Sequence, residues 1–329
     1  MTPTQSQPIK SVVPDDYPVA YGGLQHPQLA RLTAYGEVVC FSTRYADRAE
    51  FFERISDAQA VINVRAYSVF DKEAFDHAPR LGIVSILGTG TDNVDLAEAR
   101  RRGIVVTNTP AINHVAVAEL GMGLLFAAWR NIPAGDRWLR QGRWQHPATA
   151  HEITGKTLGL LGLGAIGAEM ARLGKGIGMQ VIAWSRTADP ERAARLGVEL
   201  VERDEVFKRS DAVSLHLRNT PEMRGSVGRR EFELMKPSAI LINTARAGIL
   251  NQDDLVWALT SGRIAAAGLD VHSVEPLPLE QNPYAALDNV VITPHMGGTT
   301  HESNARSRKM PVDNIIAWIE GRPEHVVNP

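Results

Sequence analysis

Three polar side chains that together suit hydride chemistry each follow a short apolar segment of the sequence. They are Arg246, Glu275 and His295. A guanidinium binds a carboxylate as a fork and polarises a carbonyl beside it. An imidazole titrates near neutrality and can protonate an alkoxide or deprotonate an alcohol, while a nearby glutamate stabilises the imidazolium form. The set predicts reversible hydride transfer at a carbonyl next to a carboxylate, with His216 and His272 as alternative acid–base residues.

A glycine pattern of the G-x-G-x-x-G type lies between an apolar segment and a helical pattern. Gly162, Gly164 and Gly167 form it, with Ala165 and Ile166 between the last two glycines. The first glycine permits a tight turn, the second lets the backbone approach a ligand, and the third lets helix and strand pack closely. The N–H groups at the start of the helix then meet phosphates. The pattern predicts a bound dinucleotide.

The end of the second strand in such a unit selects between NAD and NADP. An Asp or Glu there takes the ribose hydroxyls and repels a 2′-phosphate. The predicted strand 180–184 ends instead with Ser185 and Arg186, a hydroxyl and a guanidinium. The sequence therefore favours NADP(H), used at least as well as NAD(H). The alternative is that Arg186 lies over the adenine or faces solvent.

Short apolar segments alternate with helical patterns along most of the chain, which predicts an α/β fold with doubly wound parallel sheets. The segments are rich in Val, Ile, Leu and Ala without strict alternation, as expected where helices cover both faces of a sheet. The predicted strands are 61–64, 82–87, 103–107, 158–161, 180–184, 198–200, 212–215, 239–243, 265–269 and 290–293. Ligands of such sheets bind outside the carboxyl ends of the strands.

The 329 residues exceed the usual size of one domain, about 100 to 200 residues. Near residues 109 and 298 a predicted strand is followed by a long predicted helix, and we interpret these two positions as hinges. We expect an NAD(P)-binding domain, residues 109–298, inserted into a discontinuous substrate domain, residues 1–108 and 299–329. One continuous domain is the alternative.

The composition is that of an ordinary globular protein, with 44% apolar and 22% charged residues. The 35 basic and 37 acidic residues indicate neither a nucleic-acid partner nor an anionic membrane. The single cysteine, Cys40, fits a reducing compartment, and the polar segment 1–10 lacks the apolar stretch of a secretion signal. We therefore expect a cytoplasmic protein, and no metal site is predicted.

Motifs from about residue 61 to residue 328 form a specific combination. They include Gly88–Asp95, Gly155–Gly159, Gly268–Val271 and Thr293–Gly298. In these motifs the chain resembles the D-isomer-specific 2-hydroxyacid dehydrogenases, the group that includes D-3-phosphoglycerate dehydrogenase and glyoxylate/hydroxypyruvate reductase. The resemblance implies two Rossmann-like domains, the substrate domain being flavodoxin-like. It also implies reduction of a small 2-keto acid, such as glyoxylate, hydroxypyruvate or a phosphorylated relative, to a D-2-hydroxy acid by NAD(P)H.

The resemblance also implies a role for each candidate residue. Arg246 would bind the carboxylate and polarise the carbonyl, Glu275 would pair with the histidine, and His295 would be the acid–base group. His216 matches a position beside the cofactor, and His272 matches a variable position. Further cofactor contacts are implied at Thr244, Ala245, Asp270, Gly297 and Gly298, and substrate contacts at Gly88, Thr89 and Gly90. Arg65, at the end of the predicted strand 61–64, is a candidate second cation for a charged substrate tail.

Two other functions are compatible with the same residues. A formate- or phosphite-type dehydrogenase would use the same arginine and histidine, and a dinucleotide-sensing interaction protein would keep the fold and the three residues. The resemblance further implies a homodimer formed by the long helix from Val117 onward together with Trp138 and Trp144.

Overall fold

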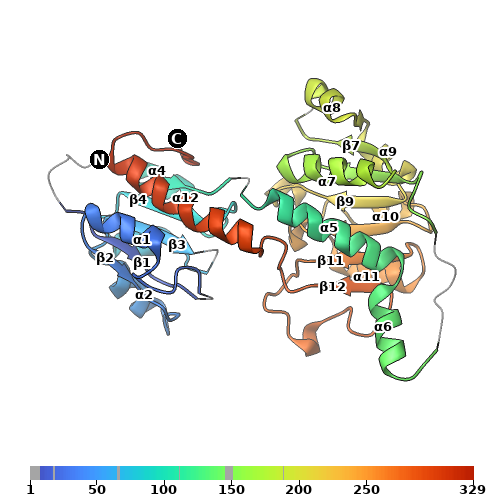
Figure 1. The fold of residues 1–329 in the computed structure, drawn as a ribbon, viewed down its shortest axis with the longest axis horizontal. Helices are drawn as coiled ribbons and strands as arrows, with labels where there is room; N and C mark the ends of the chain where they lie inside the picture. The colour runs from blue at the N-terminus through green and yellow to red at the C-terminus, as the bar shows by residue number, and fades with distance from the viewer. Residues whose placement is uncertain (1–7, 18, 65–66, 111, 145–150, 188) are drawn as a thin grey trace. The chain divides into compact units, whose positions relative to one another are not determined.

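The structure, a computed structural model, describes residues 8–17, 19–64, 67–110, 112–144, 151–187 and 189–329. It contains two parallel sheets, one of five strands and one of seven, with helices around them (Figure 1), which confirms the predicted fold class. The chain divides into two compact units. The first unit is Met1–Ile112 together with Thr300–Pro329, and the second unit is Asn113–Thr299.

The first unit contains the five-stranded sheet, with strand order β2-β1-β3-β4-β5. The strands are β1 (Ser11–Val13), β2 (Val38–Cys40), β3 (Ala60–Val64), β4 (Ile83–Leu87) and β5 (Val105–Thr107). All neighbouring strands are parallel. The sequence predicts β3, β4 and β5 but not β1 and β2.

Helices cover both faces of this sheet. The helices are α1 (Pro27–Ala30), η1 (Arg31–Ala34), α2 (Arg48–Ile55), α3 (Lys72–Asp76), α4 (Leu96–Arg101) and α12 (His301–Ile319). One face packs on α1 and α12, whose Leu29 and Ile315 are fully buried. The other face packs on α2, α3 and α4 through Phe51, Phe75 and Ala99. These last three helices each begin at an aspartate that caps the helix N-terminus.

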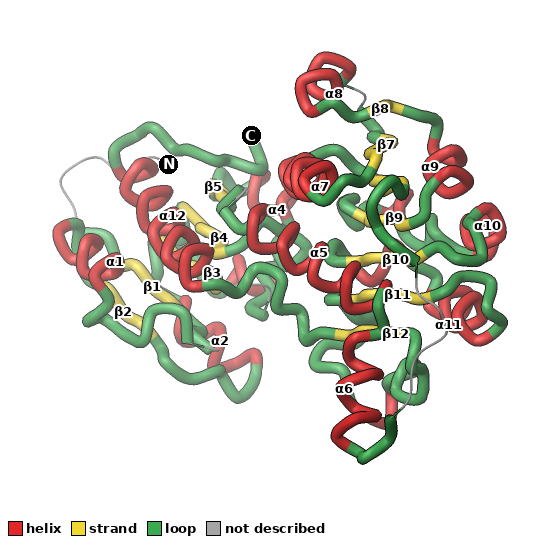
Figure 2. Tube along the Cα trace, turned by 45° about the vertical axis from the view of Figure 1, so that its right-hand side comes forward, coloured by secondary structure: helices red, strands yellow, loops and turns green. Residues whose placement is uncertain are grey.

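The second unit contains the seven-stranded sheet, with strand order β12-β11-β10-β9-β6-β7-β8. Figure 2 shows β9, β10, β11 and β12 of this sheet side by side. The strands are β6 (Thr157–Leu161), β7 (Gln180–Trp184), β8 (Glu199–Leu200), β9 (Ala212–Leu215), β10 (Ile240–Asn243), β11 (Ala266–Leu269) and β12 (Val290–Ile292). All pairs are again parallel. Each of these strands overlaps a strand predicted from the sequence.

Two layers of helices cover the second sheet. The helices are α5 (His114–Trp129), α6 (Ile132–Arg140), α7 (Ala165–Gly176), α8 (Pro190–Leu196), α9 (Arg203–Arg209), η2 (Pro221–Met223), α10 (Arg229–Leu234), η3 (Ala247–Ile249), α11 (Gln252–Thr260) and η4 (Leu279–Gln281). One core contains Leu125 of α5 and Met170 of α7. The other contains Phe207 of α9, Phe232 of α10 and Leu255 of α11.

Helix α5 is the most apolar helix of the second unit, and Ala118 and Leu125 on it have no exposed surface. Within the described residues, no single helix is both long and apolar enough to cross a membrane. Only α5 and α6 taken together reach that length and composition, across a bend of 59°.

Candidate active site

The register of the second sheet aligns the ends of five neighbouring strands. Leu161 is opposite Leu215, Leu215 is opposite Asn243, Asn243 is opposite Leu269, and Leu269 is opposite Ile292. The residues that follow these positions are Gly162, His216, Thr244, Asp270 and Thr293. They therefore lie in a row at the carboxyl edge of one sheet, the edge at which open parallel sheets bind their ligands.

The glycine pattern forms a cradle at the start of α7. Gly162 has φ of +105°, and a Cβ there would lie 2.5 Å from the carbonyl oxygen of His216. A Cβ on Gly167 would lie 2.2 Å from the carbonyl oxygen of Gly162, so packing requires the first and third glycines. A Cβ on Gly164 would meet no atom within 4 Å. The second glycine thus leaves open space in front of the helix.

The start of α7 fits the pyrophosphate of a dinucleotide. Gly164 is the N-cap residue and supplies no side chain to accept from the first turn, which contains Ala165 and Ile166. The N–H groups of such a turn have no acceptor within the helix and attract an anion. The open space at Gly164 and these N–H groups are what a bound nicotinamide dinucleotide requires of the protein.

Glu275 and His295, which the sequence predicts to be partners, are in direct contact. The Nδ1 atom of His295 lies 2.7 Å from Oε2 of Glu275. Both side chains are partly exposed, at 47% and 36%. The backbone N–H of His272 donates to the second carboxylate oxygen, Oε1, over 2.9 Å. Glu275 is therefore held at both oxygens, and the Nε2 atom of His295 is the ring nitrogen left for a substrate.

The environment of Glu275 favours its ionised form. Burial by itself raises the pKa of this carboxyl, but the hydrogen bonds from His295 and from the N–H of His272 outweigh it, so that the pKa lies below the ordinary value. An ionised carboxylate is only an acceptor, so Nδ1 of His295 must carry the proton that they share. This fixes which ring nitrogen of His295 is protonated in the neutral state.

Asp270 holds the loop that carries His295. Its Oδ1 accepts from the Thr293 hydroxyl over 2.6 Å and from the Met296 N–H over 2.8 Å, and its Oδ2 accepts from the Gly297 N–H over 2.8 Å. Asp270 is buried. His295 has φ of +52°, a conformation that costs a non-glycine residue about 1 kcal/mol. The three hydrogen bonds stabilise that conformation.

Both glycines of the loop that carries His295, Gly297 and Gly298, are closely packed. A Cβ on Gly298 would lie 2.7 Å from Nδ2 of Asn113, and one on Gly297 would lie 2.9 Å from Oδ2 of Asp270. The pair Gly297 and Gly298 therefore allows the loop to approach Asp270 and Asn113.

The two alternative histidines have other surroundings. The Nε2 atom of His272 lies 2.9 Å from the carbonyl oxygen of Thr293, so this ring ties the Glu275 loop to the His295 loop. The Nε2 atom of His216 lies 3.0 Å from the hydroxyl of Ser214. Burial lowers the pKa of His216 to about 4, which leaves it neutral at pH 7. Neither ring has the carboxylate partner that His295 has.

Arg246 follows β10 in a turn that the Asn243 side chain organises. Nδ2 of Asn243 donates to the carbonyl oxygen of Arg246 over 3.0 Å, and its Oδ1 accepts from the N–H of Ala245 over 3.0 Å. Asn243 has no exposed surface. Nη1 of Arg246 donates to the carbonyl oxygen of Ala245 over 2.8 Å, and the Arg246 side chain is half-buried. The sequence alone does not predict this role of Asn243, although its amide directly precedes the predicted turn.

Polar atoms with no hydrogen-bond partner among the described residues occur along the same edge. They are the hydroxyl of Thr244, Nδ1 of His216 and Oδ1 of Asn219, and all three are buried. Buried polar groups are rarely left without a partner. A dinucleotide with its carboxamide and ribose hydroxyls would supply such partners.

Ser185 and Arg186 follow β7, as the sequence predicts, and Arg186 is exposed. Glu222 is near enough for the charge of Arg186 to contribute to its pKa. The pKa of Glu222 lies below the ordinary value, with the largest contribution from the Thr220 side chain and a smaller one from the positive charge of Arg186. A guanidinium is thus present at the predicted ribose end of the cofactor, with an acidic neighbour.

In the first unit, the loop after β4 contains Gly88, Thr89 and Gly90. The N–H of Gly88 donates to the hydroxyl of Thr109 over 2.8 Å, and the Thr89 hydroxyl donates to the Thr109 carbonyl oxygen over 3.1 Å. The N–H of Gly88 is therefore already bonded. The N–H groups of Thr89 and Gly90 have no hydrogen bond to any residue described in the structure. Arg65 lies outside the described residues.

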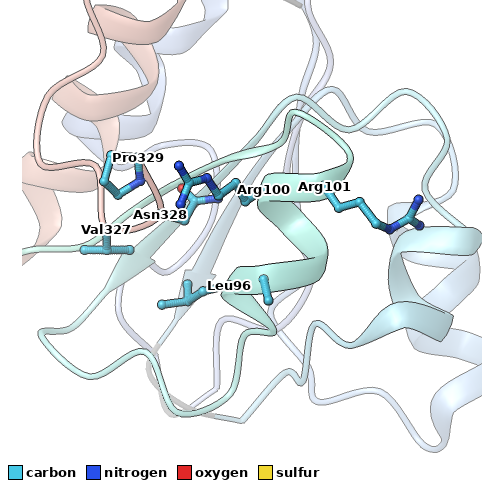
Figure 3. A pocket seen from close by; sticks show the side chains of 7 residues that line it. Leu96, Arg100, Arg101, Val327, Asn328 and Pro329 are labelled. Atoms are coloured by element: carbon cyan, nitrogen blue, oxygen red, sulfur yellow. The ribbon is translucent and has the colours of Figure 1, made fainter.

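The first unit also has a surface pocket of about 580 Å³. Its lining residues are Leu96, Ala97, Arg100, Arg101, Val327, Asn328 and Pro329 (Figure 3). None of the residues predicted for the site lines it. Over the described part of the chain, no group of three or more His, Cys, Asp or Glu side chains is arranged to hold a metal ion.

Comparison with known proteins identifies the family. The family profile "D-isomer specific 2-hydroxyacid dehydrogenase, NAD binding domain" matches residues 122–297. The chain is 39% identical over 290 residues to the glyoxylate reductase of Thermococcus litoralis, covering 85% of this chain and 87% of that one. It is 37% identical over 277 residues to the D-3-phosphoglycerate dehydrogenase of Archaeoglobus fulgidus, of which it spans only 52% while 84% of this chain is covered.

A solved structure gives the same result for the fold. An acyclic imino acid reductase, Bsp5, in complex with NADPH and D-Arg superposes with a TM-score of 0.86 at 27% identity, covering 97% of this chain and all of that one. The resemblance seen in the motifs and the predicted oxidoreductase activity are confirmed. The chain belongs to the D-isomer specific 2-hydroxyacid dehydrogenases, and it is an enzyme that transfers hydride between a nicotinamide cofactor and a 2-hydroxy or 2-keto acid.

Proposed function

We propose that this enzyme reduces small 2-keto acids to D-2-hydroxy acids with Arg246, Glu275 and His295 as its catalytic residues. The contact of 2.7 Å between Glu275 and His295 carries the proposal, because it lies at the sheet edge that also holds the dinucleotide cradle. When bound, the nicotinamide supplies hydride in reduction and accepts it in the reverse direction. The substrate class follows the glyoxylate reductase of Thermococcus litoralis.

His295 moves the proton. In the protonated ring, Nε2 donates to the substrate carbonyl oxygen and releases its proton to that oxygen as the alcohol forms, while Nδ1 stays bonded to Glu275. In the reverse direction Nε2 accepts the alcohol proton, and the ionised Glu275 stabilises the imidazolium that results. Glu275 therefore orients the ring and balances its charge.

Arg246 binds and polarises the substrate. Its guanidinium is half-buried at the end of β10, and Asn243 fixes the turn that carries it. A guanidinium in this position takes the substrate carboxylate through paired N–H groups and draws electron density from the adjacent carbonyl. In the first unit, Thr89 and Gly90, whose N–H groups have no hydrogen bond to any described residue, are proposed as substrate contacts.

We infer a preference for NADPH from Ser185 and Arg186. No acidic residue closes β7, so nothing at that position repels a 2′-phosphate, and a guanidinium is available to bind it. The second unit is then the nucleotide-binding domain and the first unit the substrate domain.

We further propose a cytoplasmic homodimer. Large apolar side chains of α5, α6 and the segment that follows are exposed, namely Phe126, Ile132, Leu139 and, at 82%, Trp144. An exposed apolar surface of this kind, which a second copy of the chain would also present, suits an isologous interface. Light scattering should give twice the mass of 35.9 kDa, and Leu139→Glu should shift it to the monomer, whereas Leu24→Glu in the first unit should not.

The test of the catalytic proposal is oxidation of NADPH with a panel of 2-keto acids, with chiral analysis of the product. We expect turnover with glyoxylate or hydroxypyruvate, a D-product where the carbon is chiral, and loss of turnover in His295→Asn. Tight NADPH binding without turnover of any acid would favour the dinucleotide-sensing interaction protein. Turnover of formate or phosphite alone would favour that type of dehydrogenase.

A further inference from the structure

Arg44, which follows β2, lies over two tyrosine rings in the first unit. Its guanidinium carbon is 4.2 Å from the ring centroid of Tyr67 and 5.5 Å from that of Tyr17. Contacts of a guanidinium with aromatic faces are attractive and fix the plane of the group, while its N–H groups stay available at the edge. Both tyrosines are exposed, so the rings and Arg44 form an accessible surface. We call Arg44, Tyr17 and Tyr67 the arginine platform.

The guanidinium of Arg44 has unused donors. Its nearest carboxylate oxygen is Oδ2 of Asp15, 3.8 Å from Nε, which is beyond hydrogen-bond distance. No residue that the structure describes accepts a hydrogen bond from Arg44. The Arg44 side chain is 46% exposed and that of Asp15 only 2%. An oriented cation with open donors is what an anionic ligand group requires.

Asp15, the acidic neighbour of Arg44, has a buried carboxylate oxygen, Oδ2, without a hydrogen-bond partner among the described residues. Burial raises the pKa of the Asp15 carboxyl above the ordinary value, although the N–H of Tyr17 and the nearby Arg44 act in the other direction. Asp15 is therefore a buried acidic neighbour of Arg44 that accepts no direct hydrogen bond from it.

Buried groups hold the arginine platform in place. The guanidinium of Arg54 is buried, and its Nη1 donates to the carbonyl oxygens of Pro14, over 2.7 Å, and Thr43, over 2.6 Å. This ties the loop after β1 to the loop after β2. The buried Asp16 accepts from the N–H groups of Ala20, Tyr21 and Gly22 and fixes the loop that carries Tyr17.

The arginine platform lies at the carboxyl edge of the first sheet. Tyr17 belongs to the loop after β1, Arg44 to the loop after β2 and Tyr67 to the loop after β3. Since the strand order is β2-β1-β3-β4, these loops extend from the loop after β4, which contains Thr89 and Gly90, toward the β2 side of the sheet. A substrate side chain that follows this edge from Thr89 and Gly90 would meet Tyr67, in the neighbouring loop, before it reaches Arg44.

We propose that Arg44 binds a second anionic group on the side chain of the substrate, so that the enzyme prefers 2-keto acids with a distal carboxylate or phosphate. This rests on the proposed function, since it assumes that the carboxyl edge of the first sheet receives the substrate. Arg44 is then a specificity-determining residue, and the chemical step at the carbonyl does not depend on it.

The test compares pairs of 2-keto acids that differ in the distal charge, at saturating NADPH. The pairs are 2-oxoglutarate with 2-oxohexanoate, and phosphohydroxypyruvate with hydroxypyruvate, and glyoxylate serves as the substrate without a tail. The wild-type enzyme should show a higher kcat/KM for the anionic member of at least one pair, and the pair concerned distinguishes carboxylate from phosphate. Arg44→Gln should lower that kcat/KM about 10- to 100-fold, mainly through KM. Arg44→Lys should restore part of the loss.

Arg48→Gln is the matched control. Arg48 has similar exposure at 42% and also lies over a ring, that of Phe52, but it is hydrogen bonded to Asp71. The Arg48→Gln variant should leave the selectivity between the members of each pair unchanged. The Arg44→Gln variant should keep the kcat/KM for glyoxylate within about threefold of the wild type. Equal loss on all substrates, or no preference for either anionic member in the wild type, overturns the proposal. Absence of turnover with every 2-keto acid would instead contradict the proposed function.

Discussion

The carboxylate of Glu275 accepts a hydrogen bond from Nδ1 of His295 over 2.7 Å, and its other oxygen is bonded to a backbone N–H. This relationship sets both the tautomer and the orientation of the imidazole. The orientation of the His295 ring therefore depends on Glu275, whose two carboxylate oxygens both accept hydrogen bonds.

Replacing Glu275 by Gln should lower kcat about 100-fold or more with a smaller change in KM, because the amide neither fixes the tautomer nor stabilises the imidazolium. The pH dependence of the free energy of unfolding provides a second measure of the role of Glu275. The pKa of Glu275 is depressed in the folded protein, so the stability it contributes is present above its unfolded pKa and is lost as pH falls through the folded value. Urea unfolding at pH 7 and at pH 3 should therefore show a smaller drop in Glu275→Gln than in the wild type. Equal kcat in variant and wild type would contradict the role given to this residue.

Asp270→Asn should displace the loop that carries His295, because an amide cannot accept from all three donors that the carboxylate binds. We expect kcat to fall about tenfold and the free energy of unfolding to fall by about 1 to 3 kcal/mol. Asp253→Asn, at an exposed position in α11, should change neither. Steady-state kinetics and denaturant unfolding measure both effects. A variant with full activity would show that the loop holds its shape without this carboxylate.

Two glycine substitutions should separate folding from cofactor binding. A Cβ at Gly162 would meet the carbonyl oxygen of His216, so Gly162→Ala should lower the Tm by several degrees. A Cβ at Gly164 meets no protein atom within 4 Å, so Gly164→Ala should keep the Tm but raise the Kd for NADPH about tenfold or more. Calorimetry and fluorescence titration measure these quantities. Unchanged NADPH affinity in Gly164→Ala would remove the proposed phosphate cradle.

His216 should make stability depend on pH. Its pKa is lowered from 6.5 to about 4 in the folded protein, so between these values the unfolded chain binds a proton that the folded chain does not. Stability is therefore full above pH 6.5 and decreases as pH falls toward 4, by at most about 3 kcal/mol from this group. His216→Gln should flatten that part of the curve. An identical pH dependence of unfolding in the variant would show that His216 does not contribute to it.

Arg186→Gln should raise the KM for NADPH about tenfold and leave the KM for NADH nearly unchanged, because only NADPH carries the 2′-phosphate. Glu222→Gln should act in the opposite direction, since it removes a negative charge beside Arg186. Arg195→Gln, an exposed arginine of α8, is the control. A wild-type enzyme with a strong preference for NADH would disprove the predicted cofactor choice.

The sequence predicts the second sheet well because its apolar segments alternate with helical patterns and because the glycine pattern marks one strand end. It also predicts the partnership of Glu275 and His295, which the structure shows as a direct contact. It does not predict the role of Asn243, whose side chain acts within a turn that has no sequence pattern of its own. It likewise does not predict a role for Arg44, because the sequence does not predict β2 and the tyrosines that contact the arginine are distant in sequence.

The residues proposed to handle the hydride and its proton all belong to the second unit, whereas the arginine platform belongs to the first unit. Reactivity and choice of acid are thus encoded in separate stretches of the gene product. A chimera that joins Asn113–Thr299 of this protein to the corresponding outer segments of a relative should inherit the relative's preferred acid and keep this protein's coenzyme.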